Sequence, residues 1–170
     1  MNSGGILKSA DGGARWAMKN AGLDGIHSSW TPRRLAADAS GNLLLLGSNA
    51  HVFRSTDQGE TWTRTAATGL PIEWMNTLIF DSYTNAFFAA TSSTYMWKTT
   101  DLGETWTSAG GDSYNYSLYS GPSDGTGTTG MLLAGTYSRG IIRSLDGGAT
   151  WNNTIGGVYW LTDISAGPNG

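Results

Sequence analysis

The 170-residue sequence contains no cysteine, two histidines and only 14% charged residues. Without cysteine the chain forms no disulfide and offers no thiolate to a metal. Two histidines, His27 and His51, are too few for a histidine-built zinc site, so we expect neither a metal nor a cofactor. Lysine and arginine total 10 and the net charge is −3, which argues against a nucleic-acid partner.

Long apolar runs are also missing. No run approaches the ~18 residues that a membrane-spanning helix needs, so we expect no membrane span. Residues 1–5 carry neither the basic nor the apolar region of a secretory signal peptide. What the sequence has instead is abundant glycine, serine and threonine, a composition that suits short strands joined by tight turns.

A repeated octet with the pattern S/T-x-D-x-G-x-T-W dominates the sequence. Its four copies are residues 9–16, 55–62, 99–106 and 144–151, and Arg15 replaces threonine in the first. Successive aspartates lie 46, 44 and 45 residues apart. One motif per period of about 45 residues is typical of repeat architectures such as propellers.

The residue types of the octet predict a self-contained turn between two strands. The aspartate can accept hydrogen bonds from backbone N–H groups that follow it, and the Ser or Thr can bond into the same turn. The glycine suits a positive φ, and the tryptophan is large enough to cover the turn. We therefore assign a structural role to the aspartates and tryptophans, which are Asp11, Trp16, Asp57, Trp62, Asp101, Trp106, Asp146 and Trp151. The spacing does not match a calcium loop, which needs several carboxylates.

The octet resembles the Asp-box, or BNR, repeat of β-propellers. This group includes sialidases, xyloglucan-cleaving glycoside hydrolases, sortilin-type receptor domains and a photosystem II assembly factor. The resemblance implies an all-β fold, a β-propeller of four-stranded antiparallel blades with Asp-box turns. It also implies that the boxes lie on the blade rim, away from the binding face.

The strand patterns predict one propeller domain that begins in the middle of a blade. A half blade over 1–18 precedes complete blades over 32–65, 75–108 and 116–153. A further blade starts over 158–170, with its first strand over 158–165. This tally of fifteen strands is one short of four blades. Because unpaired strand edges recruit other strands, we expect an incomplete ring or part of a larger propeller that pairs with further blades or another chain. A self-closed ring of four blades, one of them defective, is the alternative.

Ligand sites of propellers lie at the mouth of the central channel, where loops lead into the innermost strands. These loops carry acids and an aromatic near their ends. The candidate ligand-binding residues are Trp30, Glu73, Trp74, Asp112, Tyr114, Tyr116 and Trp160. They would form an aromatic and acidic face that stacks sugar rings. The alternative is that aromatics fill gaps between blades, which the recurring position favours for Trp30 and Trp74, whereas the polar loop around Tyr114 and Tyr116 favours exposure.

These features predict a non-catalytic scaffold or binding module that presents loops to a protein or glycan, extracellular or on a cell or virion surface. The alternative is a fragment of a glycoside hydrolase of the xyloglucanase type, which needs two acids across a cleft. Asp24, Glu73 and Asp112 can supply such a pair, but no spacing rule selects one. A sialidase is disfavoured because residues 31–35, Thr-Pro-Arg-Arg-Leu, lack the Arg-Ile-Pro signature. An assembly factor that binds protein is a third possibility.

Overall fold

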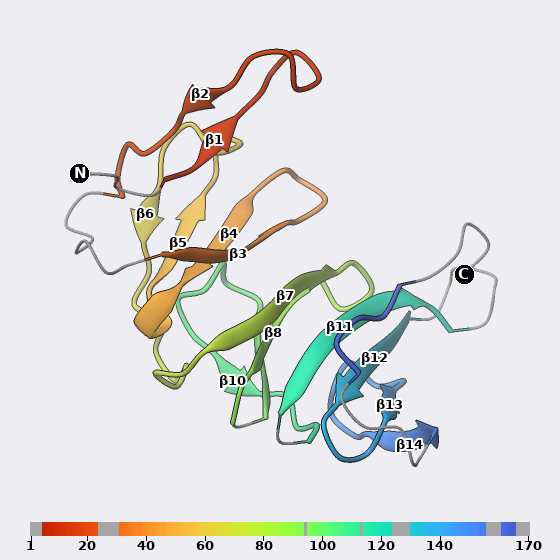
Figure 1. Ribbon diagram of the computed structural model, residues 1–170. Helices are drawn as coiled ribbons and strands as arrows, with labels where there is room; N and C mark the ends of the chain where they lie inside the picture. The colour runs from red at the N-terminus through yellow and green to blue at the C-terminus, as the bar shows by residue number, and fades with distance from the viewer. Residues whose placement is uncertain are drawn as a thin grey trace.

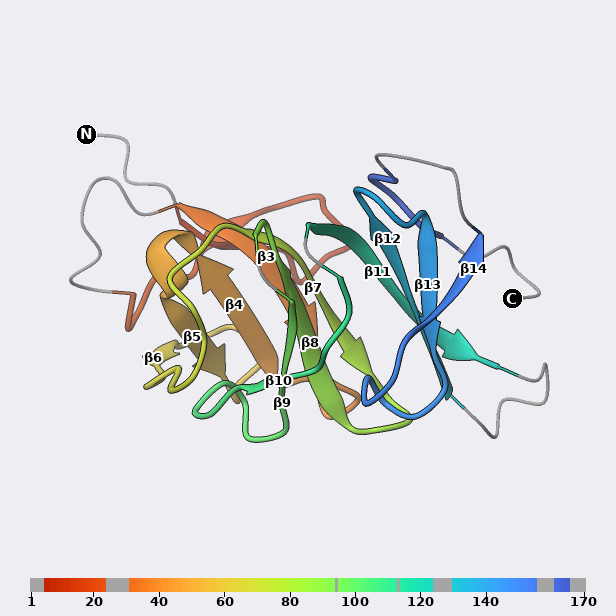
Figure 2. The same cartoon turned by 90° about the horizontal axis from the view of Figure 1, so that it is seen from below.

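The computed structural model of the protein describes residues 5–23, 31–93, 95–112, 114–123, 130–155 and 161–165. Over these residues the fold is all-β, with three four-stranded antiparallel sheets and one two-stranded sheet (Figure 1). Each four-stranded sheet is a meander in which neighbours in sequence are neighbours in space. Figure 2 shows the three sheets side by side in chain order.

We call the two-stranded sheet the half-blade and the others the first, second and third blades. The half-blade is β1 (Leu7–Lys8) and β2 (Ala17–Met18). The first blade is β3 (Pro32–Ala37), β4 (Leu43–Gly47), β5 (Val52–Ser55) and β6 (Thr63–Arg64), with a short 3-10 turn η1 (Ser48–Ala50) before β5. The second is β7 (Met75–Asp81), β8 (Ala86–Thr91), β9 (Met96–Thr99) and β10 (Thr107–Ser108). The third is β11 (Asn115–Pro122), β12 (Gly130–Thr136), β13 (Ile141–Ser144) and β14 (Asn152–Ile155).

The core lies between the blades rather than within them. All six residues of β8 are buried, and they alternate between two neighbours because successive strand side chains point to opposite faces. Phe87 and Ala89 pack with Leu44 of the first blade. Phe88 packs with Leu132 of the third blade, on the opposite face. A smaller cluster joins the half-blade region to the first blade.

The first strand of each complete blade begins with the same irregularity. The pairing register shifts between Pro32 and Arg34, between Met75 and Thr77, and between Asn115 and Ser117. One residue is therefore left over at each start, and a bulge of this kind re-aims a side chain. The three residues concerned are Arg33, Asn76 and Tyr116.

The C-terminal part differs from the expected strand over 158–165. Residues 161–165 belong to no strand, and 158–160 lie outside the described residues. A strand needs a ladder partner, and 161–165 pair with no strand in the described chain. Leu161 instead lies against Gly135 of β12. No helix in the described part of the chain is long and apolar enough to cross a membrane.

Candidate functional site

The octets form closed turns between the third and fourth strands of their blades. In the first blade, Asp57 accepts hydrogen bonds from the Thr61 amide (2.9 Å), the Thr61 hydroxyl (2.5 Å) and the Ser55 hydroxyl (2.7 Å). The Gly59 amide donates to the Ser55 oxygen (2.7 Å). The second and third blades repeat this set of bonds. The half-blade repeats it except for the hydroxyl bond, because Arg15 stands where the other octets have threonine.

These bonds hold the box carboxylates ionised. Bonds from the Thr150 hydroxyl, the Thr150 amide and Ser144 lower the pKa of Asp146 to about 2. Equivalent bonds lower the pKa of Asp57 further, again with the Thr61 hydroxyl as the main cause. Burial raises the pKa of Asp101, but its hydrogen bonds outweigh this and the pKa is lowered. The box aspartates are thus engaged within their own turns.

The boxes of the three complete blades also contact the chain segment that precedes their blade. The Trp62 indole donates to the Lys19 carbonyl oxygen (3.0 Å), and the Trp62 amide donates to the Ala21 carbonyl oxygen (2.8 Å). The Trp106 amide donates to the Thr68 carbonyl oxygen in the same way (2.8 Å). Trp62 and Trp106 are buried in these seams. The box residues therefore stabilise the blades and their junctions.

The opposite end of the blades carries the loops that lead into the first strands. In an antiparallel meander these loops lie at the same end as the hairpins between second and third strands. Hydrogen bonds join them in each blade, from Ser48 N to Thr31 O (3.1 Å), from Ser92 N to Trp74 O (2.9 Å) and from Tyr137 N to Tyr114 O (3.1 Å). We call this end, with its loops and hairpins, the mouth face.

Large apolar side chains gather on the mouth face and remain exposed. Trp74 is 62% exposed and Tyr114 is 46% exposed, although both precede a buried first strand. The other members are Ile72, Tyr95 and Tyr137. Scattered exposed apolar residues are normal, but five on the loops at one end of the blades make this face a candidate contact surface.

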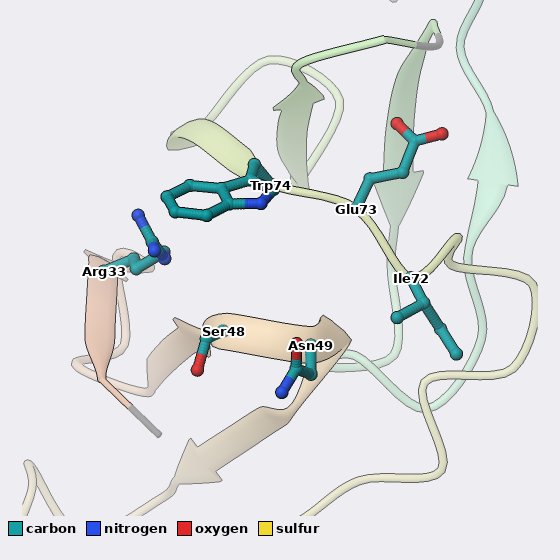
Figure 3. Close-up of a pocket in the computed structure, with 6 residues that line it drawn as sticks. All are labelled: Arg33, Ser48, Asn49, Ile72, Glu73 and Trp74. Carbon is teal, nitrogen blue, oxygen red and sulfur yellow. The ribbon is translucent and has the colours of Figure 1, made fainter. Parts of the chain in front are cut away.

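A pocket opens on this face between the first and second blades (Figure 3). Its volume is about 110 Å³, and it is lined by Arg33, Ser48, Asn49, Ile72, Glu73 and Trp74. The Arg33 guanidinium carbon lies 3.8 Å from the centre of the Trp74 ring, a cation–π contact. Figure 3 shows the Glu73 carboxylate directed away from Arg33.

A second cluster lies on the mouth end of the third blade. The Tyr114 and Tyr137 rings are tilted against each other with centroids 5.9 Å apart. Asp112 accepts a hydrogen bond from the Ser138 hydroxyl (3.2 Å) and lies 3.9 Å from Arg139. This cluster joins aromatic surface to a carboxylate that is already engaged.

Comparison with known proteins agrees with this geometry. Residues 53–64, which contain the second octet, match the model of the BNR/Asp-box repeat. The second octet is therefore a BNR/Asp-box repeat, and the described blades have a propeller fold. A search of the curated proteins finds no match to this sequence.

Several solved structures share this fold over part of their length. A GH74 enzyme of Niastella koreensis is 24% identical, with a TM-score of 0.56, over 72% of this chain and 22% of the enzyme. YCF48 bound to D1 peptide is 16% identical, with a TM-score of 0.60, over 85% of this chain and 45% of YCF48. The extracellular domain of a hybrid two-component system, BT4673 from B. thetaiotaomicron, is 14% identical, with a TM-score of 0.54, over 74% of this chain and 17% of that chain. The propeller chain thus spans less than half of each of these proteins.

The structure separates the site residues that the sequence suggested. Glu73 and Trp74 line the pocket beside Arg33, whereas Asp112 and Tyr114 belong to the third-blade cluster. The packing interpretation of Trp74 is wrong, because strand residues such as Leu44 and Phe87 fill the gap between blades. Tyr116 is half-buried at a bulge. Asp24, His27, Trp30 and Trp160 lie outside the described residues.

Sequence reasoning did not find Ile72, Tyr95, Tyr137 or the pairing of Arg33 with Trp74. Tyr95 and Tyr137 lie in or next to hairpins between second and third strands. Aligning the blades by their octets places those hairpins at the mouth end, so this signal was present in the repeat itself. The contact between Arg33 and Trp74 joins two blades, and no local pattern encodes it.

Proposed function

We propose that this propeller is a non-catalytic binding module that holds a protein partner on its mouth face. The observation that carries the proposal is the exposure of Ile72, Trp74, Tyr95, Tyr114 and Tyr137 at one end of the blades. Aromatic side chains are enriched in protein interfaces, where they bury large areas at little entropic cost. The box carboxylates at the other end are engaged by hydrogen bonds within their own turns.

The likeness to YCF48 bound to D1 peptide supports a peptide or protein ligand, since that structure holds a peptide. A surface or extracellular location fits this role, and the likeness to an extracellular domain supports it. The location is tested separately by fractionating cells that express the full-length protein.

The proposal is tested with immobilised peptides and glycans probed by the purified chain. We expect peptide binding that falls at least about tenfold in Trp74→Ala and in Tyr114→Ala, as for interface hot spots. Tyr83→Ala is the matched control, because Tyr83 is exposed in the β7–β8 turn at the opposite end. Binding to glycans alone, or equal loss in the Tyr83 variant, would overturn the assignment to a protein-binding mouth face.

A second candidate function is part of a glycoside hydrolase, which the likeness to the GH74 enzyme supports. Its acids would be Glu73 with Asp112 or with a carboxylate from elsewhere in a longer protein. Asp112 is held by Ser138 and lies near Arg139, whereas Glu73 lines a different pocket. Turnover of xyloglucan or sialosides that is lost in Glu73→Gln and Asp112→Asn would establish this candidate, and an inactive native chain would exclude it for these residues.

A further inference from the structure

The pocket between the first and second blades contains a guanidinium that has no acidic partner among the described residues. Arg33 forms no ion pair with any residue of the described chain. Its Nε is buried and has no hydrogen-bond partner within that part of the molecule. A buried, unsatisfied donor of this kind costs free energy, and a charged one costs more. A ligand that supplies a hydrogen-bond acceptor to this donor would therefore bind with a favourable free energy.

The neighbours of Arg33 fix its position without neutralising it. The Trp74 ring lies 3.8 Å from the guanidinium carbon, and the Glu73 carboxylate points away from it (Figure 3). Next in the chain, Arg34 does not line the pocket, and its Nε donates to the Asn76 carbonyl oxygen of the second blade. The register shift at the start of β3 places the two arginines in these different settings. Arg33 is thus held at the pocket wall with its charge available.

The rest of the pocket is small and mixed in character. Ile72 and Trp74 form an apolar wall, while Ser48 and the left-handed Asn49 (φ 60°) supply polar groups across from it (Figure 3). The pocket volume of about 110 Å³ has room for a small polar group on a short stem.

We infer that this pocket binds a carboxylate of the partner, an acidic side chain or a chain terminus, attached to an apolar stem. This inference rests on the proposed function and names the chemistry that the mouth face selects. Guanidinium groups match carboxylates through two parallel N–H···O bonds, and the Nε–H of Arg33 is one such donor. A single cation beside apolar walls suits a singly charged group of this size, whereas a phosphate carries more charge and more acceptors.

The inference is tested with a peptide array. Each peptide is made with a free C-terminal carboxylate and with a C-terminal amide, and each of these is made with its Asp and Glu residues and with Asn and Gln in their place. We expect the native chain to bind carboxylate forms at least about tenfold more tightly, the value of one charge-assisted hydrogen bond. Arg33→Gln removes this preference, and Arg33→Lys retains part of it. Arg64→Gln is the matched charge control, because Arg64 is exposed on β6. Weaker binding of the C-terminal amide identifies a chain terminus as the bound carboxylate. Weaker binding of the Asn and Gln forms identifies an acidic side chain.

A second readout keeps the test independent of folding defects. The Arg33 Nε–H resonance of the native chain should shift on titration with a bound carboxylate peptide and stay unchanged with its amide or Asn counterpart. Peptide binding that depends on Trp74 but not on the carboxylate or on Arg33 would overturn this inference and leave the proposed function standing. No binding of any peptide would overturn both.

Discussion

Arg54 on β5 of the first blade pairs with Glu104 in the octet of the second blade, with Nη1 2.9 Å from Oε1. Lys8 of the half-blade pairs in the same way with Glu60 of the first-blade octet, at 2.8 Å. In each case a cation three residues before a box aspartate faces the sixth position of the next octet. The octets thus join neighbouring blades as well as closing their own turns.

The seam between the second and third blades lacks this pair. Ala149 occupies the position of the glutamate, and Lys98 Nζ lies 3.5 Å from the Gly147 carbonyl oxygen. Ala149→Glu should raise the free energy of unfolding by about 0.2–1 kcal/mol, as for partly exposed ion pairs, measured by urea denaturation at low salt. The gain should shrink at high salt, because salt screens the pair. An equal gain in a Lys98→Met background would contradict the pairing.

Gly69 permits the close approach of two blades. Its φ is 91°, and a Cβ at this position would lie 2.3 Å from the Trp106 carbonyl oxygen. Gly69→Ala should destabilise the chain through left-handed strain of about 1–2 kcal/mol plus a clash of about 1–3 kcal/mol. Gly12→Ala is the control, because Gly12 also has a positive φ but nothing lies within 4 Å of its added Cβ. If Gly69→Ala and Gly12→Ala lose the same stability in thermal or urea unfolding, the close approach of the two blades is unimportant.

Asp101 closes the second-blade octet. Asp101→Ala removes acceptors for the Thr105 amide and hydroxyl, at 2.9 and 2.6 Å. We expect a loss of about 1–2 kcal/mol, the usual cost of removing such a side-chain cap, in urea unfolding. Asp101→Asn keeps one acceptor oxygen and should lose less. An Asp101→Ala variant with the same free energy of unfolding as the native chain would refute the structural role of the box.

The box carboxylates also predict how stability depends on pH. Their pKa values in the folded chain lie below those of the unfolded chain, and that of Asp146 is about 2. The unfolded chain therefore binds more protons as the pH falls, so this stabilisation is complete above about pH 5 and declines as the pH falls toward 2. Thr150→Val should raise the pKa of Asp146, as measured by NMR titration of the carboxyl carbon. An unchanged pKa would rule out the hydroxyl bond as its cause.

The sequence predicts the blades well because the octet is local. Its bonds run from Asp57 to Ser55 and Thr61, within four residues, so residue types and spacing suffice to read them. The mouth face is harder, because it forms where loops of different blades meet. A recurring position suggested packing for Trp74, but only the three-dimensional arrangement shows the ring beside Arg33 with most of its surface exposed.

The expected strand over 158–165 shows a related limit. An apolar segment becomes a strand only where a partner offers a free edge, and its sequence does not say whether one is present. Residues 161–165 lie near β12 without entering a ladder. Pairing between distant segments is therefore the part of this fold that local patterns leave open.

The central claim is that the mouth face, and not the octets, meets the partner. The most direct measurement compares the affinity of one array-selected peptide for the native chain, for Trp74→Ala/Tyr114→Ala and for Asp101→Ala, under conditions where all three are folded. We predict that the mouth variant loses at least about tenfold in affinity while Asp101→Ala binds as the native chain does. Loss of binding in Asp101→Ala with an unaffected mouth variant would contradict the account.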